Sequence, residues 1–200
     1  MAGTESQPAR VPSQWAPHAP AGSLLVPNGN FEQGSTVWTE FSQLGWDLIV
    51  NSGFPTGVAP RSGSWATWLA GDFDEISWIE QQITLPSNAS MLSYYHWIDS
   101  EDLCGTPVNQ VYDIAKISIN GNIIDEYDLC EDANTGNWEL HEVAISSYAG
   151  QTVMVRIRAD ADDSFNSNLF IDDVSIETAE VIFLDNFESG NTSAWSFQTP

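Results

Sequence analysis

NLFIDDVSI, residues Asn168–Ile176, is the stretch around which this 200-residue chain is organised. It is rich in Val, Ile and Phe, and the spacing of its apolar residues indicates a β-strand. Phe170, Val174 and Ile176 fall on one face of that strand, and Ile171 falls on the other. We therefore expect a strand that is buried in the protein core.

Two adjacent carboxylates, Asp172 and Asp173, interrupt this apolar strand. An ionised carboxylate inside a protein is costly unless a cation or a hydrogen-bond donor meets it. The whole chain has only 5 Lys and Arg residues, so a protein cation is not the expected partner. We expect a bound Ca²⁺ instead, since this ion prefers carboxylate oxygens.

The overall charge is strongly negative and restricts the possible partners. The chain has 28 Asp and Glu residues, a net charge of −23 and a pI near 4.1. This charge disfavours nucleic acid, which needs a basic surface, and it disfavours anionic membranes. It favours divalent cations or simply solubility in a saline exterior. The 42% hydrophobic content and nine Trp argue against global disorder, and no apolar run is long enough to predict a transmembrane helix.

Short apolar segments separated by turn residues follow one another from residue 23 onward. Asn120–Gly121 between two of them is a strong hairpin signal, and only a short helical turn is expected, at 146–148. The pattern predicts an all-β protein, an antiparallel β-sandwich of jelly-roll type. The expected strands cover residues 23–26, 46–50, 64–70, 76–85, 91–98, 111–119, 122–129, 138–145, 152–159 and 169–176.

Three parts of the chain differ in character. Residues 1–22 contain four Pro and predict an arm or linker, residues 23–178 form the expected sandwich, and residues 179–200 form a tail. The tail holds an orphan β-strand, Val181–Phe187. It also repeats a motif, because NFEQGST near the start recurs there as NFESGNT.

Antiparallel connections bring several loops to one end of the expected sandwich. If strand 91–98 runs up, the loops 71–75, 99–110, 130–137 and 160–167 all lie at the top. Many carboxylates on one rim repel each other unless a hard cation is present. The acidic residues at or beside this end are Asp72, Asp74, Glu75, Asp99, Glu101, Asp102, Asp113, Asp160, Asp162 and Asp163.

Within this rim the best candidate for a Ca²⁺ site is a cluster of Asp99, Glu101 and Asp113, with Asp162 or Asp163 lending a further ligand. A hydrated acidic rim without a metal ion is the alternative. Both explanations fit the composition.

A second candidate Ca²⁺ site pairs Glu32 with Asp172 or Asp173, through pairing of the first and last strands. The alternative is a carboxylate that accepts hydrogen bonds and caps a turn. Zn²⁺ is not expected, because the three His residues lie in different segments without ligand spacing.

The two cysteines, Cys104 and Cys130, both fall in the top loops. A disulfide between them is therefore geometrically reasonable. It indicates an oxidising compartment and a secreted protein, although the chain starts without a signal peptide.

An aromatic surface is the candidate ligand-binding region. If strands 76–85 and 91–98 pair, Trp78 lies opposite Trp97 and Glu80 lies opposite Tyr95, with Gln82 beside them. Such a platform suits stacking on a sugar ring, and it equally suits packing beneath a loop such as 51–63. Trp65, Trp68 and Trp138 are expected in the core.

Catalysis has little support in the sequence. There is no G-x-S-x-G motif, and His141-Glu142 lacks the second His of a zinc peptidase. Carboxylate pairs are so numerous that proximity of two of them does not indicate a glycosidase. We expect a protein that is not an enzyme.

The order of several motifs resembles the MAM-like and carbohydrate-binding-like jelly-roll modules of secreted bacterial proteins, which are often appended to peptidases and glycosidases. The motifs are NGNFEQG, RSGSWATWLAG, YYHWIDSED, VYD, SSYAGQTVMVRIRA and SNLFIDDVSI, within residues 24–177. The resemblance implies a structural Ca²⁺ at Glu32 and Asp172–Asp173, and acidic ligands at Asp99, Glu101 and Asp113. The cysteine pair and the lack of an attached catalytic domain depart from that pattern.

The sequence therefore predicts a non-catalytic, extracellular, Ca²⁺-stabilised module for binding or adhesion, with a protein or carbohydrate ligand. The alternative is a structural subunit of an extracellular filament or matrix. Such a subunit would assemble by strand donation from the N-terminal arm or from Val181–Phe187.

Overall fold

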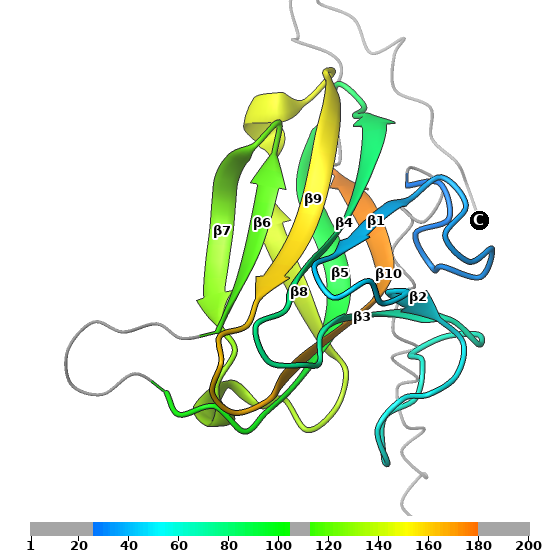
Figure 1. Cartoon of the computed structure of the whole chain (residues 1–200). Helices are drawn as coiled ribbons and strands as arrows, with labels where there is room; N and C mark the ends of the chain where they lie inside the picture. The colour runs from blue at the N-terminus through cyan, green and yellow to red at the C-terminus, as the bar shows by residue number, and fades with distance from the viewer. Residues whose placement is uncertain (1–25, 105–112, 180–200) are drawn as a thin grey trace, which may run out of the picture.

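A computed structural model of the chain describes residues 26–104 and 113–179. It is an antiparallel β-sandwich of two five-stranded sheets (Figure 1). Sheet I has the strand order β1-β4-β9-β6-β7, and sheet II has the order β2-β3-β10-β5-β8. The predicted all-β sandwich is confirmed. The strands are β1 (Thr39–Ser42), β2 (Ile49–Val50), β3 (Ala66–Ala70), β4 (Ile76–Thr84), β5 (Ala89–Ser100), β6 (Ile114–Ile119), β7 (Asn122–Asp128), β8 (Glu139–Ala144), β9 (Thr152–Asp160) and β10 (Ser167–Thr178).

Local sequence signals account for the tight connections. Asn120 and Gly121 have φ angles of 52° and 80°, the left-handed conformation that a two-residue hairpin needs, and they join β6 to β7 as predicted. A 3-10 turn, η2 (Ser146–Tyr148), occupies the predicted helical turn, and a second one, η1 (Glu131–Ala133), follows Cys130.

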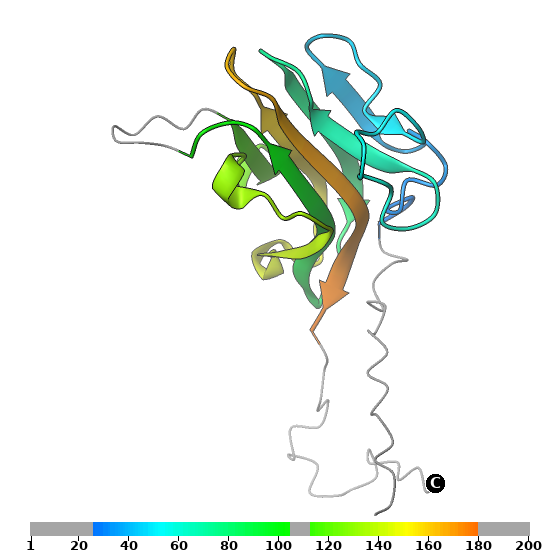
Figure 2. The same cartoon turned by 90° about the horizontal axis from the view of Figure 1, so that it is seen from below.

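The strand that holds Asp172 and Asp173 is β10, which lies between β3 and β5 (Figure 2). Its register against β5 shifts after Asp172, and Asp173 has a φ of 52°, so the two carboxylates lie at a β-bulge. The bulge changes which residues face inward. Ile171 and Val174 both belong to the core, whereas Phe170 packs against aromatic rings on the outer face. The predicted face with Phe170 beside Val174 is therefore wrong.

The described chain begins at Val26 with a series of turns, and residues 23–25 of the predicted first strand lie outside the described residues. Glu32 lies in a run of turns that ends before β1, and buried Phe31 anchors this segment in the core. The amide of Val174 donates a hydrogen bond to the carbonyl of Gly29 at 2.8 Å. The two ends of the sandwich thus lie together, as expected, but a turn makes the contact.

The expected pairing of 76–85 with 91–98 is also wrong. β4 pairs with β1 and β9 in sheet I, and β5 pairs with β10 and β8 in sheet II. The connection 85–88 therefore crosses from one sheet to the other instead of forming a hairpin. Alternating inward and outward residues look the same in both cases, because each strand buries one face against the same core.

The arm 1–22 and the tail strand Val181–Phe187 lie outside the described residues, so their predicted roles stay predictions. Within the described part of the chain, no helix has the length and hydropathy needed to cross a bilayer.

Candidate functional site

Several loops meet at one end of the sandwich, as the strand directions predict. The amide of Asp74 donates to the carbonyl of Asp162 at 2.7 Å, and the amide of Glu131 donates to the carbonyl of Asp102 at 2.8 Å. These bonds hold together loops from both sheets. The acidic rim is therefore one continuous surface.

Three carboxylates of this rim, Asp102, Asp113 and Asp162, form an acidic cluster. Asp162 donates its amide to Oδ1 of Asp113 at 2.7 Å. The side chain of Asp113 is 1% exposed, and its Oδ2 has no hydrogen-bond partner among the described residues. Burial raises the pKa of Asp113 and of Asp102, and repulsion from neighbouring carboxylates raises both pKa values further. A cation at this point would offset both the burial of these carboxylates and their mutual repulsion.

Not all the predicted members take part in this cluster. Asp113 and Asp162 were both predicted, but Asp99, Glu101 and Asp163 are exposed, and buried Asp102 lies beside them instead. In residues 26–104 and 113–179, no three His, Cys, Asp or Glu side chains converge closely enough to hold a metal ion by themselves. Any Ca²⁺ here would also need backbone carbonyl oxygens and water as ligands.

The predicted disulfide joins Cys104 to Cys130, with a Cα–Cα distance of 5.0 Å. It ties the segment that carries Asp102 to the end of β7. In the loop-entropy model, a link across 26 residues stabilises the fold by about 3 kcal/mol.

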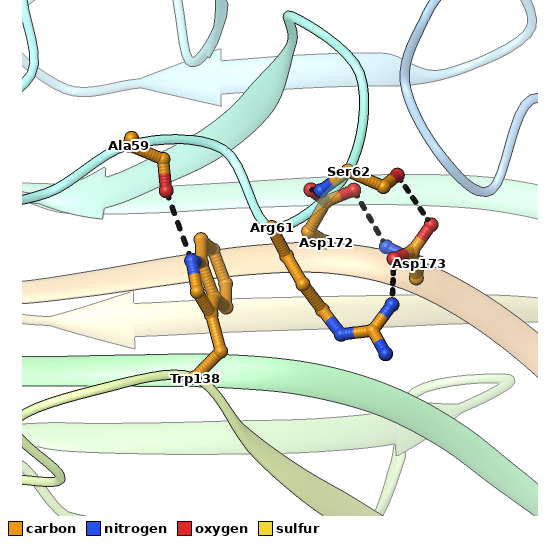
Figure 3. Close-up of polar contacts among 6 residues, drawn as sticks. All are labelled: Ala59, Arg61, Ser62, Trp138, Asp172 and Asp173. Atoms are coloured by element: carbon orange, nitrogen blue, oxygen red, sulfur yellow. Dashed lines mark hydrogen bonds and ion pairs between the residues drawn. The ribbon is translucent and has the colours of Figure 1, made fainter. Parts of the chain in front are cut away.

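The carboxylates at the bulge of β10 are met by one loop (Figure 3). Asp172 is fully buried and accepts the Ser62 amide at 3.0 Å, while Asp173 forms an ion pair with Arg61. Burial raises the pKa of Asp172 to about 7, and the charge of Asp173 adds to that rise. The expectation that no protein cation would be the partner is thus wrong for Asp173, since one of the five basic residues lies beside it.

Glu32 binds the same loop two residues further along. Its Oε1 accepts the amides of Ser64 and Trp65 at 2.8 and 2.9 Å. Its carboxylate lies so close to Gly63 that a Cβ there would come within 2.5 Å. Glu32 and Asp172 therefore each accept amides from the segment 62–65, as expected for carboxylates that cap turns.

The loop 51–63 covers the outer face of sheet II. Phe54 packs on Phe170 with ring centroids 6.1 Å apart, and the carbonyl of Ala59 accepts the indole N–H of Trp138 at 2.9 Å. The guanidinium of Arg61 lies 3.3 Å from the ring centre of Tyr95 (Figure 3 shows its neighbours). The open alternative, packing beneath this loop, is therefore the one that the structure supports for Tyr95.

The predicted platform is divided between the two outer faces of the molecule. Tyr95 and Trp97 lie on sheet II, where Trp97 meets Trp138 edge to face. Trp78, Glu80 and Gln82 lie in β4 of sheet I. The five residues therefore cannot contact one sugar ring.

On sheet I, Trp78 is enclosed by its neighbours. It stacks on Phe41 with ring centroids 5.3 Å apart, and the guanidinium of Arg156 lies 4.1 Å from its ring centre. Arg156 also donates to Glu80 at 2.6 and 2.8 Å. A neighbouring aromatic ring and a guanidinium thus already pack against the indole ring of Trp78, which limits its surface for a ligand.

A different pair of tryptophans borders a hollow of about 230 Å³ beside β2 and β3. Trp46 is 59% exposed and forms one wall, and half-buried Trp68 forms another. Gly71, with a φ of 85°, lets the following loop pack on Trp68, because a Cβ would lie 2.5 Å from the indole nitrogen. Asp47 and Asp72 also line the hollow. We call these residues the Trp46 hollow.

The Trp46 hollow does not follow from the strand pattern, which predicts a strand over 46–50 that includes Trp46. In the structure, β2 covers only Ile49–Val50. In the sequence, Gly45 directly before Trp46 was the sign of a loop, and the structure gives Gly45 a φ of 85°. Trp68 and Trp138 were expected in the core, yet both lie on the outer face of sheet II.

Two histidines from separate segments meet where the edges of the two sheets approach, at β7 and β8. The rings of His96 and His141 lie 5.1 Å apart. His141 Nε2 lies 2.7 Å from a carboxylate oxygen of Asp125, and His96 Nδ1 lies 3.2 Å from the hydroxyl of Tyr127. Burial, together with the neighbouring His141, lowers the pKa of His96 to about 4. This group links β5 and β8 of sheet II to β7 of sheet I.

Solved structures share this fold at low sequence identity. TmCBM61, solved in complex with β-1,4-galactotriose, is 16% identical, with a TM-score of 0.56 over 78% of this chain and 98% of its own. The K3 cleaved adhesin domain of Lys-gingipain from Porphyromonas gingivalis W83 is 15% identical, with a TM-score of 0.56 over 77% of this chain and 99% of its own. A Stig cyclase from Fischerella sp. TAU is 13% identical, with a TM-score of 0.46 over 78% and 97%. No protein-family model and no curated protein sequence matches the chain. The similarity establishes a β-sandwich of the kind found in carbohydrate-binding modules.

Proposed function

We propose that this chain is a non-catalytic, extracellular module that binds carbohydrate in the Trp46 hollow. The observation that carries the proposal is the exposed indole of Trp46 beside a hollow with a second indole, Trp68, in its wall. A concave hollow lined by aromatic side chains and a few polar groups is typical of ligand-binding sites.

The lining of the hollow suits a sugar. The apolar face of a pyranose ring packs on an indole, and its hydroxyl groups donate hydrogen bonds to carboxylates. Asp47 and Asp72 supply such acceptors beside the two tryptophans. The similar structure of TmCBM61 was solved with a neutral galactose trisaccharide, which supports this class of ligand.

We propose that a Ca²⁺ ion binds at the acidic cluster and stabilises the fold. The unpartnered Oδ2 of buried Asp113 is the observation that favours it, and Asp102 and Asp162 are the neighbouring carboxylates. The ion would neutralise charges that otherwise repel each other. At Glu32 and Asp172 the carboxylates already accept hydrogen bonds from backbone amides, so the case for a Ca²⁺ ion is weaker there.

A Tm measurement tests the ion. The protein is first treated with a chelator. Addition of excess CaCl₂ should then raise its Tm by about 5–10 °C, as expected for a ligand at a hundredfold excess over Kd. Asp113→Asn should abolish that rise, and Glu142→Gln, which changes an exposed carboxylate of β8 away from the cluster, should leave it unchanged. A Ca²⁺-dependent rise that survives in Asp113→Asn would contradict the assignment.

Secretion is proposed from the disulfide, because such bonds persist in oxidising compartments. The strongly negative charge suits an exterior of variable salt.

Retention on immobilised neutral polysaccharides tests the binding function. The wild-type chain should be retarded on at least one of β-1,4-galactan, glucomannan and xylan. Trp46→Ala should weaken binding about tenfold or more, since removal of a central aromatic anchor costs about 2 kcal/mol. Trp97→Ala and Phe165→Ala, which remove an aromatic ring elsewhere, should bind as the wild type does. Equal binding by Trp46→Ala, or no retention of the wild type, would refute the proposal.

A further inference from the structure

A second hollow adjoins the Trp46 hollow at β2. It has a volume of about 530 Å³. Asp47, Val50 and Ser52 line both hollows. The two hollows are therefore neighbours along the same edge of the molecule.

The second hollow has a different chemistry from the first. Exposed amide and hydroxyl groups of Gln33, Ser35 and Asn51 line it, and half-buried Trp65 supplies apolar surface. Carboxamides both donate and accept hydrogen bonds, so they match the paired hydroxyl groups of a sugar. An aromatic wall followed by an amide-lined wall fits a chain of linked sugar units better than a single one.

The charges of the lining decide which sugar chain fits. Glu40, Asp47 and Asp72 contribute carboxylates, and no Lys or Arg lines either hollow. The described basic residues, Arg61, Lys116, Arg156 and Arg158, are paired with carboxylates elsewhere. A uronate-containing polymer would be repelled here, whereas uncharged hydroxyl groups would be accepted.

We propose that the two hollows form one groove across β2, and that it binds an internal stretch of a neutral polysaccharide rather than a single sugar or an anionic chain. This rests on the proposed function of the Trp46 hollow. The border between the hollows is formed by Asp47, Val50 and Ser52, at and beside the two-residue strand β2. The tryptophans of the first hollow anchor one part of the chain, and Gln33 and Asn51 hold the next.

Calorimetric titration with oligosaccharides of two to six units, prepared from β-1,4-galactan, glucomannan and xylan, tests the groove. On the series that binds, affinity should rise about tenfold from two to six units, the equivalent of one or two additional hydrogen bonds. The double variant Gln33→Ala/Asn51→Ala should lose that rise and still bind the disaccharide normally. The control Gln82→Ala/Asn122→Ala removes the same functional groups from exposed positions of sheet I and should behave as the wild type. Polygalacturonate should not compete.

The outcomes separate this inference from the proposed function. If Trp46→Ala abolishes binding but affinity does not depend on length, the Trp46 hollow stands and the extended groove is wrong. The groove is equally wrong if the double variant weakens the disaccharide as much as the hexasaccharide, or if polygalacturonate competes. If neither Trp46→Ala nor the double variant changes binding, both proposals fail.

Discussion

At the scale of single residues, His96 is the clearest source of pH dependence. Its side chain is 7% exposed, and burial beside His141 lowers its pKa from 6.5 to about 4. The unfolded chain therefore binds a proton more readily than the folded chain between these two pH values. The folded state therefore has its full stability from neutral His96 above about pH 6.5, and it loses that stability as the pH falls towards 4. This contribution amounts to about 3 kcal/mol of unfolding free energy.

Urea unfolding at pH 7 and pH 4 measures this effect. Buried carboxylates such as Asp172 have raised pKa values and act in the opposite direction, so the comparison is with His96→Gln, which does not titrate. The wild type should lose about 3 kcal/mol more than the variant between the two pH values. Equal losses would show that His96 does not stay neutral in the folded state.

The two carboxylates of β10 show what single residues reveal in the sequence. An interrupted apolar strand correctly predicts that Asp172 and Asp173 need partners, because burial of an unpaired charge is so costly. The sequence did not indicate which groups are the partners of these two carboxylates. Arg61 is 112 residues from Asp173, and only the fold brings the loop that carries it across the sheet.

At the scale of elements, the N-terminal turn and β10 are joined by backbone contact at Gly29. A Cβ at this position would lie 2.0 Å from the carbonyl oxygen of Val174, which is backbone and cannot rotate away. Gly29→Ala should therefore separate the turn from the strand and lower the unfolding free energy by about 2–4 kcal/mol. In Gly136→Ala, where the new Cβ meets open space, the left-handed φ alone should cost about 1 kcal/mol. Similar losses in the two variants by thermal denaturation would rule out a structural role for the close contact.

Strand alternation predicted most elements and their directions, but it did not predict which strands are neighbours. Residues such as Ile79 and Tyr94 are in the core, on the face that alternation along their strands predicts. Neither the crossing at 85–88 nor the bulge at Asp172 changes that alternation in a recognisable way. The candidate binding site therefore moved from Trp78 and Trp97 to Trp46, which lies in a loop where no periodicity applies.

At the scale of the whole molecule, the disulfide supports the loop end of the sandwich. Reduction, or Cys104→Ser/Cys130→Ser, should lower the unfolding free energy by about 3 kcal/mol. It should also weaken Ca²⁺-dependent stabilisation, because Asp102 lies in the segment that the bond holds. Unchanged denaturant midpoints after confirmed reduction would mean that the loops are held by their hydrogen bonds alone.

The described faces of the molecule differ in how their side chains are engaged. The outer face of sheet II is closed by the loop 51–63, sheet I carries paired charges around Trp78, and the acidic loops lie at one end. The edge at β2 is left with the exposed indole and the two adjoining hollows. We propose that ligand binding takes place at this edge.

Two-dimensional NMR of the tryptophan indole N–H signals tests this assignment most directly. The signals are followed during titration with the oligosaccharide that binds most strongly. The signals of Trp46 and Trp68 should shift in proportion to occupancy, while those of Trp78, Trp97 and Trp138 stay in place. Shifts centred on Trp97 and Trp138, or saturation of binding with Trp46 unmoved, would place the ligand elsewhere and contradict a binding site at the β2 edge.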